Sequence, residues 1–162
     1  MRKLMLILCC FSFFNCFFNT ENGSVDPVFS RYQPIVLSTA AFENSIEIQD
    51  AKAVTEASKI YIINNFIFIN DKRTGFHIFD NSYPSNPIKK KFLKAPGATD
   101  IAIRDNVLYI NQATDLVVLT FDFNTLAMVV SKRVRNVFPE LRSPDGEWFY
   151  EEDKVVVNWI QN

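Results

Sequence analysis

The chain has 162 residues, of which 48% are hydrophobic, and this is enough for one domain with its own core. Its formal net charge is -1, so it lacks the basic surplus with which nucleic-acid-binding proteins neutralise phosphates, and no nucleic-acid partner is expected. It has 16 phenylalanines but only 4 glycines, so its turns must be built mainly from Asn, Asp, Ser and Pro.

The N-terminus has the composition of an export signal. The cationic start "MRK" precedes an apolar run from Leu4 to Phe14, which is too short to span a bilayer as a lone helix. The three cysteines, Cys9, Cys10 and Cys16, lie in or just after this run. None remains downstream for a disulfide, a catalytic thiol or a metal cluster.

This arrangement resembles a bacterial lipoprotein signal, in which the cysteine at the cleavage point is lipidated and becomes the new N-terminus. Cys16 fits best, because it follows the apolar run and precedes the polar stretch "FFNTENGSVDP". The resemblance implies a signal peptide over residues 1–15, and a lipidated Cys16 with a flexible tether over residues 16–31. It also implies a lipid anchor in the outer membrane or another cell-envelope membrane, outside the cytoplasm. The alternatives are an uncleaved anchor and a conventional secretory signal.

Residues 32–58 are predicted to form N-terminal strands and a connector. Two short apolar strands are expected at Pro34–Ser38 and Ser45–Gln49. The following "DAKAVTEAS" is low in β-branched and aromatic residues. It is interpreted as a connector, either one helical turn or a loop.

A four-stranded pattern begins at Lys59 and recurs 41 residues later at Asp100. "KIYIINNFIFIN" predicts two strands around Asn64-Asn65, because asparagine tolerates positive φ in a two-residue hairpin turn. "DIAIRDNVLYIN" repeats the pattern around Asp105-Asn106. Each hairpin is followed by a third strand that ends on Asp, "GFHIFD" and "DLVVLTFD", and by a fourth strand, "PIKKKFLK" and "TLAMVVSKRV".

A third unit begins near the C-terminus, with strands expected at Trp148–Glu151 and Val155–Ile160, and does not finish. A period near 41 residues with four strands per unit is typical of propeller blades. Residues 59–162 are therefore predicted to be all-β, with four-stranded antiparallel units of β-propeller-blade type. About two and a half units would form a partial or open propeller. We expect "YQPIVLS" to complete the last unit, or the open sheets to be covered by another chain.

These residues resemble the LVIVD-repeat family, which consists of secreted or lipid-anchored bacterial proteins of β-propeller-type fold. The positions that fit the family pattern are Gly75, Asp80, Pro84, Pro87, Gly97, Asp100 and Ala102. The stretches "YQPI" and "DNSYPSNP" also resemble a group of short lipoproteins from Bacteroidota. The resemblance covers about Lys59–Asp122 and implies a fold and an envelope location, but no activity. In the second unit Leu116 stands in place of the glycine, and "FNTLAMV" stands in place of the double-proline turn, so that corner must be built differently.

Residues for catalysis or metal binding are scarce. His77 is the single histidine; it alternates with Phe76 and Ile78 and is predicted to lie on the strand surface without a functional role. One histidine without a thiol largely excludes zinc sites and serine-type triads. The sequence therefore predicts no catalytic, metal or cofactor-binding residues, and no cofactor.

Two carboxylates, Asp80 and Asp122, stand at the ends of the two third strands. They are predicted to cap turns by accepting hydrogen bonds from backbone N–H groups. The alternative is a pair of carboxylates that supports hydrolysis of a glycosidic bond.

The main basic cluster is "KKKFLK" at Lys89–Lys94. It is predicted to lie in an outermost strand, where its lysines prevent edge-to-edge pairing; the alternative is contact with an anionic membrane or glycan phosphate. The late aromatic residues are expected to pack in the core, with stacking on sugars as the alternative. They are Trp148, Phe149, Tyr150 and Trp159.

These patterns favour a lipid-anchored cell-envelope protein without catalysis, with a β-repeat binding or scaffolding surface. Its expected partners are the membrane, an envelope protein or glycan, and copies of itself. The alternative is an envelope glycan-directed carboxylate hydrolase, which would gather at least two carboxylates in one cleft. A third interpretation is a shortened propeller that is stable only as an assembly.

Overall fold

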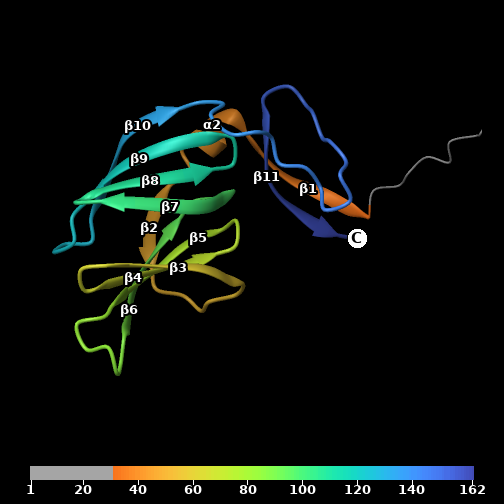
Figure 1. The fold of residues 1–162 in the computed structure, drawn as a ribbon. Helices are drawn as coiled ribbons and strands as arrows, with labels where there is room; N and C mark the ends of the chain where they lie inside the picture. The colour runs from red at the N-terminus through yellow and green to blue at the C-terminus, as the bar shows by residue number, and fades with distance from the viewer. Residues whose placement is uncertain (1–30) are drawn as a thin grey trace, which may run out of the picture.

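The computed structural model describes residues 31–162, and their fold is all-β apart from one short helix (Figure 1). The signal peptide and lipidation site predicted at residues 1–15 and Cys16 lie outside the described residues. In chain order the elements are β1 (Tyr32–Ser38), α2 (Thr39–Glu43), β2 (Glu47–Asp50), β3 (Ala57–Ile63), β4 (Phe66–Asp71), β5 (Gly75–Asp80), β6 (Ile88–Lys94), β7 (Ala98–Arg104), β8 (Val107–Gln112), β9 (Asp115–Phe121), β10 (Met128–Val134) and β11 (Lys154–Gln161). Within residues 31–162, no helix has the length and apolar character needed to cross a membrane.

The strands form three open antiparallel sheets. The five-stranded sheet has the order β2-β6-β5-β4-β3, and the four-stranded sheet has the order β10-β9-β8-β7. A two-stranded ribbon pairs β1 with β11. The predicted all-β fold with four-stranded antiparallel units is therefore confirmed, as an open arrangement in which the sheets do not close into a ring.

The two predicted hairpins are present at the expected turns. Asn64, between β3 and β4, has φ of 51°, and Asp105, between β7 and β8, has φ of 53°. Asparagine and aspartate enter this left-handed region more readily than other non-glycine residues. The two hairpins therefore use the same local chemistry.

The core lies between the five-stranded and four-stranded sheets. Tyr61, Phe68 and Ile78 pair across β3, β4 and β5 and share one face of the five-stranded sheet. They pack in a single cluster with residues of the four-stranded sheet such as Ile101 and Leu108. Burial of each large apolar side chain contributes about 1.5–3 kcal/mol.

The five-stranded and four-stranded sheets stack in the same orientation, so the face of one sheet packs against the opposite face of the other. Ile101 is buried against the five-stranded sheet, whereas Ile60, the equivalent residue 41 positions earlier, points away from the core and is 61% exposed. Conversely Phe68 is fully buried, whereas its equivalent Tyr109 is 37% exposed. Equivalent side chains thus face the same direction along the stack, as expected for consecutive propeller blades.

The third unit is a ribbon made from both ends of the described chain. The segment "YQPIVLS" pairs with β11, as expected for a strand borrowed from the N-terminus. The strand predicted at Trp148–Glu151 is wrong, because these residues have no strand partner and run as a loop.

Between β1 and β2 lies α2, which the sequence patterns missed. Ser38 caps this helix by accepting a hydrogen bond from the N–H of Ala41. The prediction that "KKKFLK" forms an outermost strand is wrong for Lys91–Lys94, which pair with β2 at the sheet edge, whereas Lys89 and Lys90 have no partner in β2.

The connector between β2 and β3 is forced across the outer face of the five-stranded sheet, that is, the face turned away from the four-stranded sheet. These consecutive strands occupy opposite edges, separated by four inter-strand gaps, or about 19 Å. The seven steps from Asp50 to Ala57 reach about 24 Å when fully extended. Residues 51–56, hereafter the crossing segment, must therefore be nearly extended and lie directly on the sheet.

One corner differs between the two units. In the first, a three-residue turn leads from Asp71 to Gly75, whose φ is 148° and whose missing Cβ would lie 2.1 Å from the carbonyl oxygen of Leu93. In the second, a two-residue turn leads from Gln112 to Asp115. This shorter turn removes the close approach that requires glycine. The second unit therefore needs no glycine at this corner.

The stacked arrangement predicts opposite effects for two equivalent substitutions. Ile101→Asp places a charge in the core and is expected to lower the free energy of unfolding by more than about 3 kcal/mol. Ile60→Asp, at the exposed equivalent position, is expected to change it by less than about 1 kcal/mol. Urea unfolding followed by circular dichroism compares the two, and equal losses would contradict the stacking.

Candidate functional site

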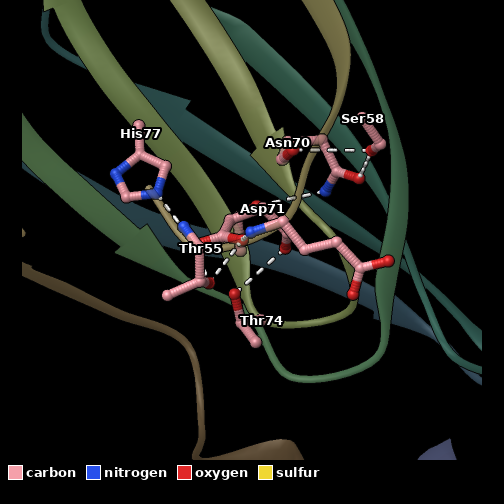
Figure 2. A network of polar contacts seen from close by, with 8 residues as sticks. Thr55, Ser58, Asn70, Asp71, Thr74 and His77 are labelled. Carbon is pink, nitrogen blue, oxygen red and sulfur yellow. Dashed lines mark hydrogen bonds and ion pairs between the residues drawn. The ribbon is translucent and has the colours of Figure 1, made fainter. Parts of the chain in front are cut away.

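The most connected buried polar group lies where the crossing segment meets the outer face of the five-stranded sheet (Figure 2). The side chains of His77 and Asp71 are fully buried, and His77 Nε2 lies 2.9 Å from Asp71 Oδ2. Thr55 contacts both carboxylate oxygens of Asp71 through its hydroxyl, at 2.7 and 2.8 Å. The carboxylate also accepts hydrogen bonds from the backbone N–H of Glu56 at 2.7 Å and of Thr55 at 3.2 Å.

These contacts decide the charge of Asp71. Burial by itself would raise the pKa of its carboxyl, but the hydrogen bonds from Glu56, His77 and Thr55 together lower the pKa to about 2. An ionised carboxylate only accepts hydrogen bonds, so His77 donates through Nε2–H. The carboxylate therefore holds the crossing segment against β4 and β5.

His77 is not on the strand surface, so the prediction of an exposed side chain is wrong. The alternation with Phe76 and Ile78 is right, but the crossing segment covers the face on which His77 lies. The centre of its ring lies 4.8 Å from the ring centre of Phe92. Its Nδ1 is buried without a hydrogen-bond partner among the described residues. A buried second nitrogen has no path to a substrate, so the pair stabilises the fold and does not form an accessible acid or base.

A second network occupies the corresponding end of the four-stranded sheet. Arg133 donates to Asp115 at 3.0 Å and to the side chain of Gln112 at 2.9 Å. It also donates to the carbonyl oxygen of Glu43 at the end of α2, while Gln112 donates to Ser45 at 3.0 Å. In both units a polar network therefore ties an earlier part of the chain to one end of a sheet. This part is the crossing segment in the first unit, and the end of α2 with Ser45 in the second. Sequence spacing gave no signal for either network, since their partners lie far apart in the chain.

The two strand-end carboxylates cap turns, as predicted. Asp80 accepts from the N–H of Ser82 at 2.9 Å, and Asp122 accepts from the N–H of Asn124 at 2.8 Å. These hydrogen bonds lower the pKa of both carboxyl groups. The two side chains belong to different sheets and do not form a pair.

One cleft does gather two carboxylates, Glu43 and Asp153, beside the start of α2. Arg135 bonds Glu43 at 2.6 Å, and this hydrogen bond lowers the pKa of Glu43. A general acid at neutral pH needs a raised pKa, and the pKa of Glu43 is shifted in the opposite direction. Among residues 31–162, no cluster of three His, Cys, Asp or Glu side chains is placed to hold a metal ion.

The lysines of the basic cluster are engaged within the protein. Lys91 contacts Asp50 at 2.8 Å and Lys94 contacts Glu47 at 3.7 Å, so two of them hold β2 against β6. Lys90 contacts Asp80 at 3.3 Å, and Lys89 lies 5.8 Å from the ring centre of Phe79. Their main structural role is to pair β2 with β6 and to cover the sheet.

The late aromatic residues divide into two groups. Trp159 is partly buried and donates from its indole N–H to the carbonyl oxygen of Leu141, and Phe149 is partly buried. Trp148 and Tyr150 are 57% and 82% exposed, so the prediction of core packing is wrong for these two. They lie on a loop and lack the strand pairing that would turn them inward.

Residues 55–92 match the family model of the LVIVD repeat. Over these residues the chain is similar to the LVIVD repeat. The match begins at Thr55 and ends at Phe92, so the LVIVD repeat includes the whole Asp71 network together with β3, β4 and β5. The predicted LVIVD resemblance is confirmed there, and the chain is a β-repeat protein. Searches of curated proteins and of solved structures found no match.

The Asp71 network predicts a specific acid dependence. Because the folded-state pKa of Asp71 is about 2, below the ordinary value of 3.8, its stabilisation is present near neutral pH and is lost as the pH falls toward 2. Asp71→Asn is expected to cost about 2–4 kcal/mol near pH 6, and this difference from the parent should shrink by about 2 kcal/mol near pH 2. Urea unfolding at several pH values measures it.

Asp50→Asn is the matched control, because Asp50 has a lysine partner but its side chain is 97% exposed. This control should leave the free energy of unfolding nearly unchanged at any pH, because solvent screens an exposed ion pair. A constant difference between parent and Asp71→Asn across the pH range would contradict an ionised, hydrogen-bonded Asp71.

Proposed function

We propose that this β-repeat protein is a non-catalytic scaffold, held on a cell-envelope membrane by a lipid at Cys16. Its partner, in this proposal, is a further β-sheet that docks on the outer face of the five-stranded sheet. The observation that carries the proposal is the exposure of Ile60 and Ile62, which are 61% and 67% exposed.

The repeat itself indicates what such a face packs against. Across the strand ladder, Ile60 pairs with Ile69, Ile62 pairs with Ile67, and Ile67 pairs in turn with Phe79, so these side chains share the outer face. The equivalent residues of the second unit pack against another sheet in the core; they are Ile101, Ile103, Leu108, Ile110 and Leu119. The outer face of the first unit thus has the apolar pattern of a blade face without its neighbouring blade.

An uncovered face of this kind favours association. Two adjacent isoleucines at such exposure form an apolar patch, and patches of this kind mark interaction sites on soluble proteins. Covering each would contribute about 1.5–3 kcal/mol. The occupant can be a second copy of this chain or another envelope protein, and the two differ in the mass of the complex.

The lipid anchor rests on the sequence around Cys16. The apolar run before this cysteine and the polar stretch after it support its assignment as the end of a lipoprotein signal. Lipid chains contribute about 0.8 kcal/mol per buried methylene, so a multiply acylated cysteine would hold the domain firmly at a membrane surface. Confinement there would raise the effective concentration of a partner on the same membrane.

The docking face is tested by placing a photo-crosslinking amino acid at Ile62 in the full chain in cells. A discrete adduct is expected, and its mass identifies a second copy or a different protein. Val129 is the matched control, because it is also 67% exposed but lies on β10 of the other sheet. Absence of an adduct at Ile62, or equal adducts at both positions, would contradict the proposal.

The anchor is tested by labelling cells with a fatty-acid analogue. We expect label on the full-length protein and none on Cys16→Ala, because that substitution removes the acceptor thiol. Cys9→Ala serves as the control and should keep the label. Equal labelling of parent and Cys16→Ala would show that Cys16 is not the acceptor.

A further inference from the structure

A groove of about 380 Å³ lies between the two-stranded ribbon and one end of the five-stranded sheet. Its volume is within the range of small-molecule sites. β1 contributes Ile35 and Leu37, β11 contributes Val157, and the sheet side contributes Phe92 and Pro96. No strand ladder joins the ribbon to the five-stranded sheet, so the two surfaces meet through side chains and leave this apolar space.

The charges around the groove are of one sign. Lys52, Arg73 and Lys94 line it, and no carboxylate among the described residues does. Lys94 has Glu47 at 3.7 Å, and Lys52 lies 3.7 Å from the ring centre of Phe92. An apolar wall with a cationic rim is complementary to a molecule with an apolar body and one anionic end.

Arg73 is a partly buried member of this set, and one of its guanidinium nitrogens has no hydrogen-bond partner among the described residues. No carboxylate of residues 31–162 lies within ion-pair distance of its guanidinium, and its Nη1 is buried without a hydrogen-bond partner there. Burial lowers the pKa of Arg73, and the charge of Glu56 acts in the opposite direction. A buried guanidinium N–H without an acceptor is costly, and an anion beside it would remove that cost.

We propose that this groove is a binding site for an aliphatic carboxylate, with the chain against Ile35, Leu37 and Val157 and the carboxylate at Arg73. Lys52 and Lys94 flank the anionic end. The site is separate from the docking face at Ile60 and Ile62, so each can fail without the other.

The test uses octanoate and the full chain in nanodiscs of neutral phospholipid, with empty nanodiscs subtracted. Octanoate should bind. Octanol, which has the same chain without the charge, should bind at least about tenfold more weakly. Arg73→Gln should weaken octanoate binding about tenfold, the loss expected for one charge-assisted hydrogen bond, and should leave octanol binding unchanged. Lys89→Gln, at the other end of β6, is the matched control and should leave both unchanged.

The place of binding is read from methyl resonances in the same sample. Octanoate should shift the methyl signals of Leu37 and Val157 and leave those of Ile60 and Ile62 in place. The proposal is overturned by three results: no octanoate binding, equal binding of octanoate by parent and Arg73→Gln, or shifts confined to Ile60 and Ile62. The last would mean that the apolar chain binds only to the exposed sheet face. An unchanged methyl spectrum of unliganded Arg73→Gln shows that the variant is folded.

Discussion

The attachment of the crossing segment to Asp71 is the interaction on which the rest of the structure depends. Residues 51–56 must pass from one edge of the five-stranded sheet to the other with little slack. An extended backbone has N–H groups that need acceptors when it lies on a sheet, and the carboxylate of Asp71 supplies them for Thr55 and Glu56. Because β2 can reach its place beside β6 only if this crossing is held, one buried carboxylate connects both edges of the sheet.

The same crossing divides the outer face of the five-stranded sheet into two parts. Where the segment passes, His77 and Phe92 are fully buried. Farther along β3, Ile60 and Ile62 stay exposed, although their equivalents in the second unit face the core. The stack is thus closed internally between two units and open at one end, where the exposed isoleucines lie.

The ribbon of β1 and β11 has a different relation to the stack. It is joined to the four-stranded sheet through α2, which Arg133 holds by the carbonyl oxygen of Glu43. It meets the five-stranded sheet only across the groove that Arg73 lines. Two sheets are therefore tightly packed, and between the third and the five-stranded sheet a groove remains beside the unbonded guanidinium nitrogen of Arg73. Scaffolding and small-molecule binding, as proposed, would use different surfaces of one β-repeat protein.

The sequence by itself determined the local elements. Strand alternation, the Asn64 and Asp105 turns and the turn-capping Asp80 and Asp122 all depend on neighbours a few residues away, so the sequence predicts them directly. The recurrence of these local patterns after 41 residues then indicates the repeat. Only the tertiary structure decided which strand takes an edge, and therefore that β2 covers β6, that His77 is buried and that Trp148 is exposed. Asp71 and Thr55, or Arg133 and Glu43, meet through sheet order and not through spacing. Alternation along a strand tells which residues share a face, but what covers that face is set by segments distant in the chain.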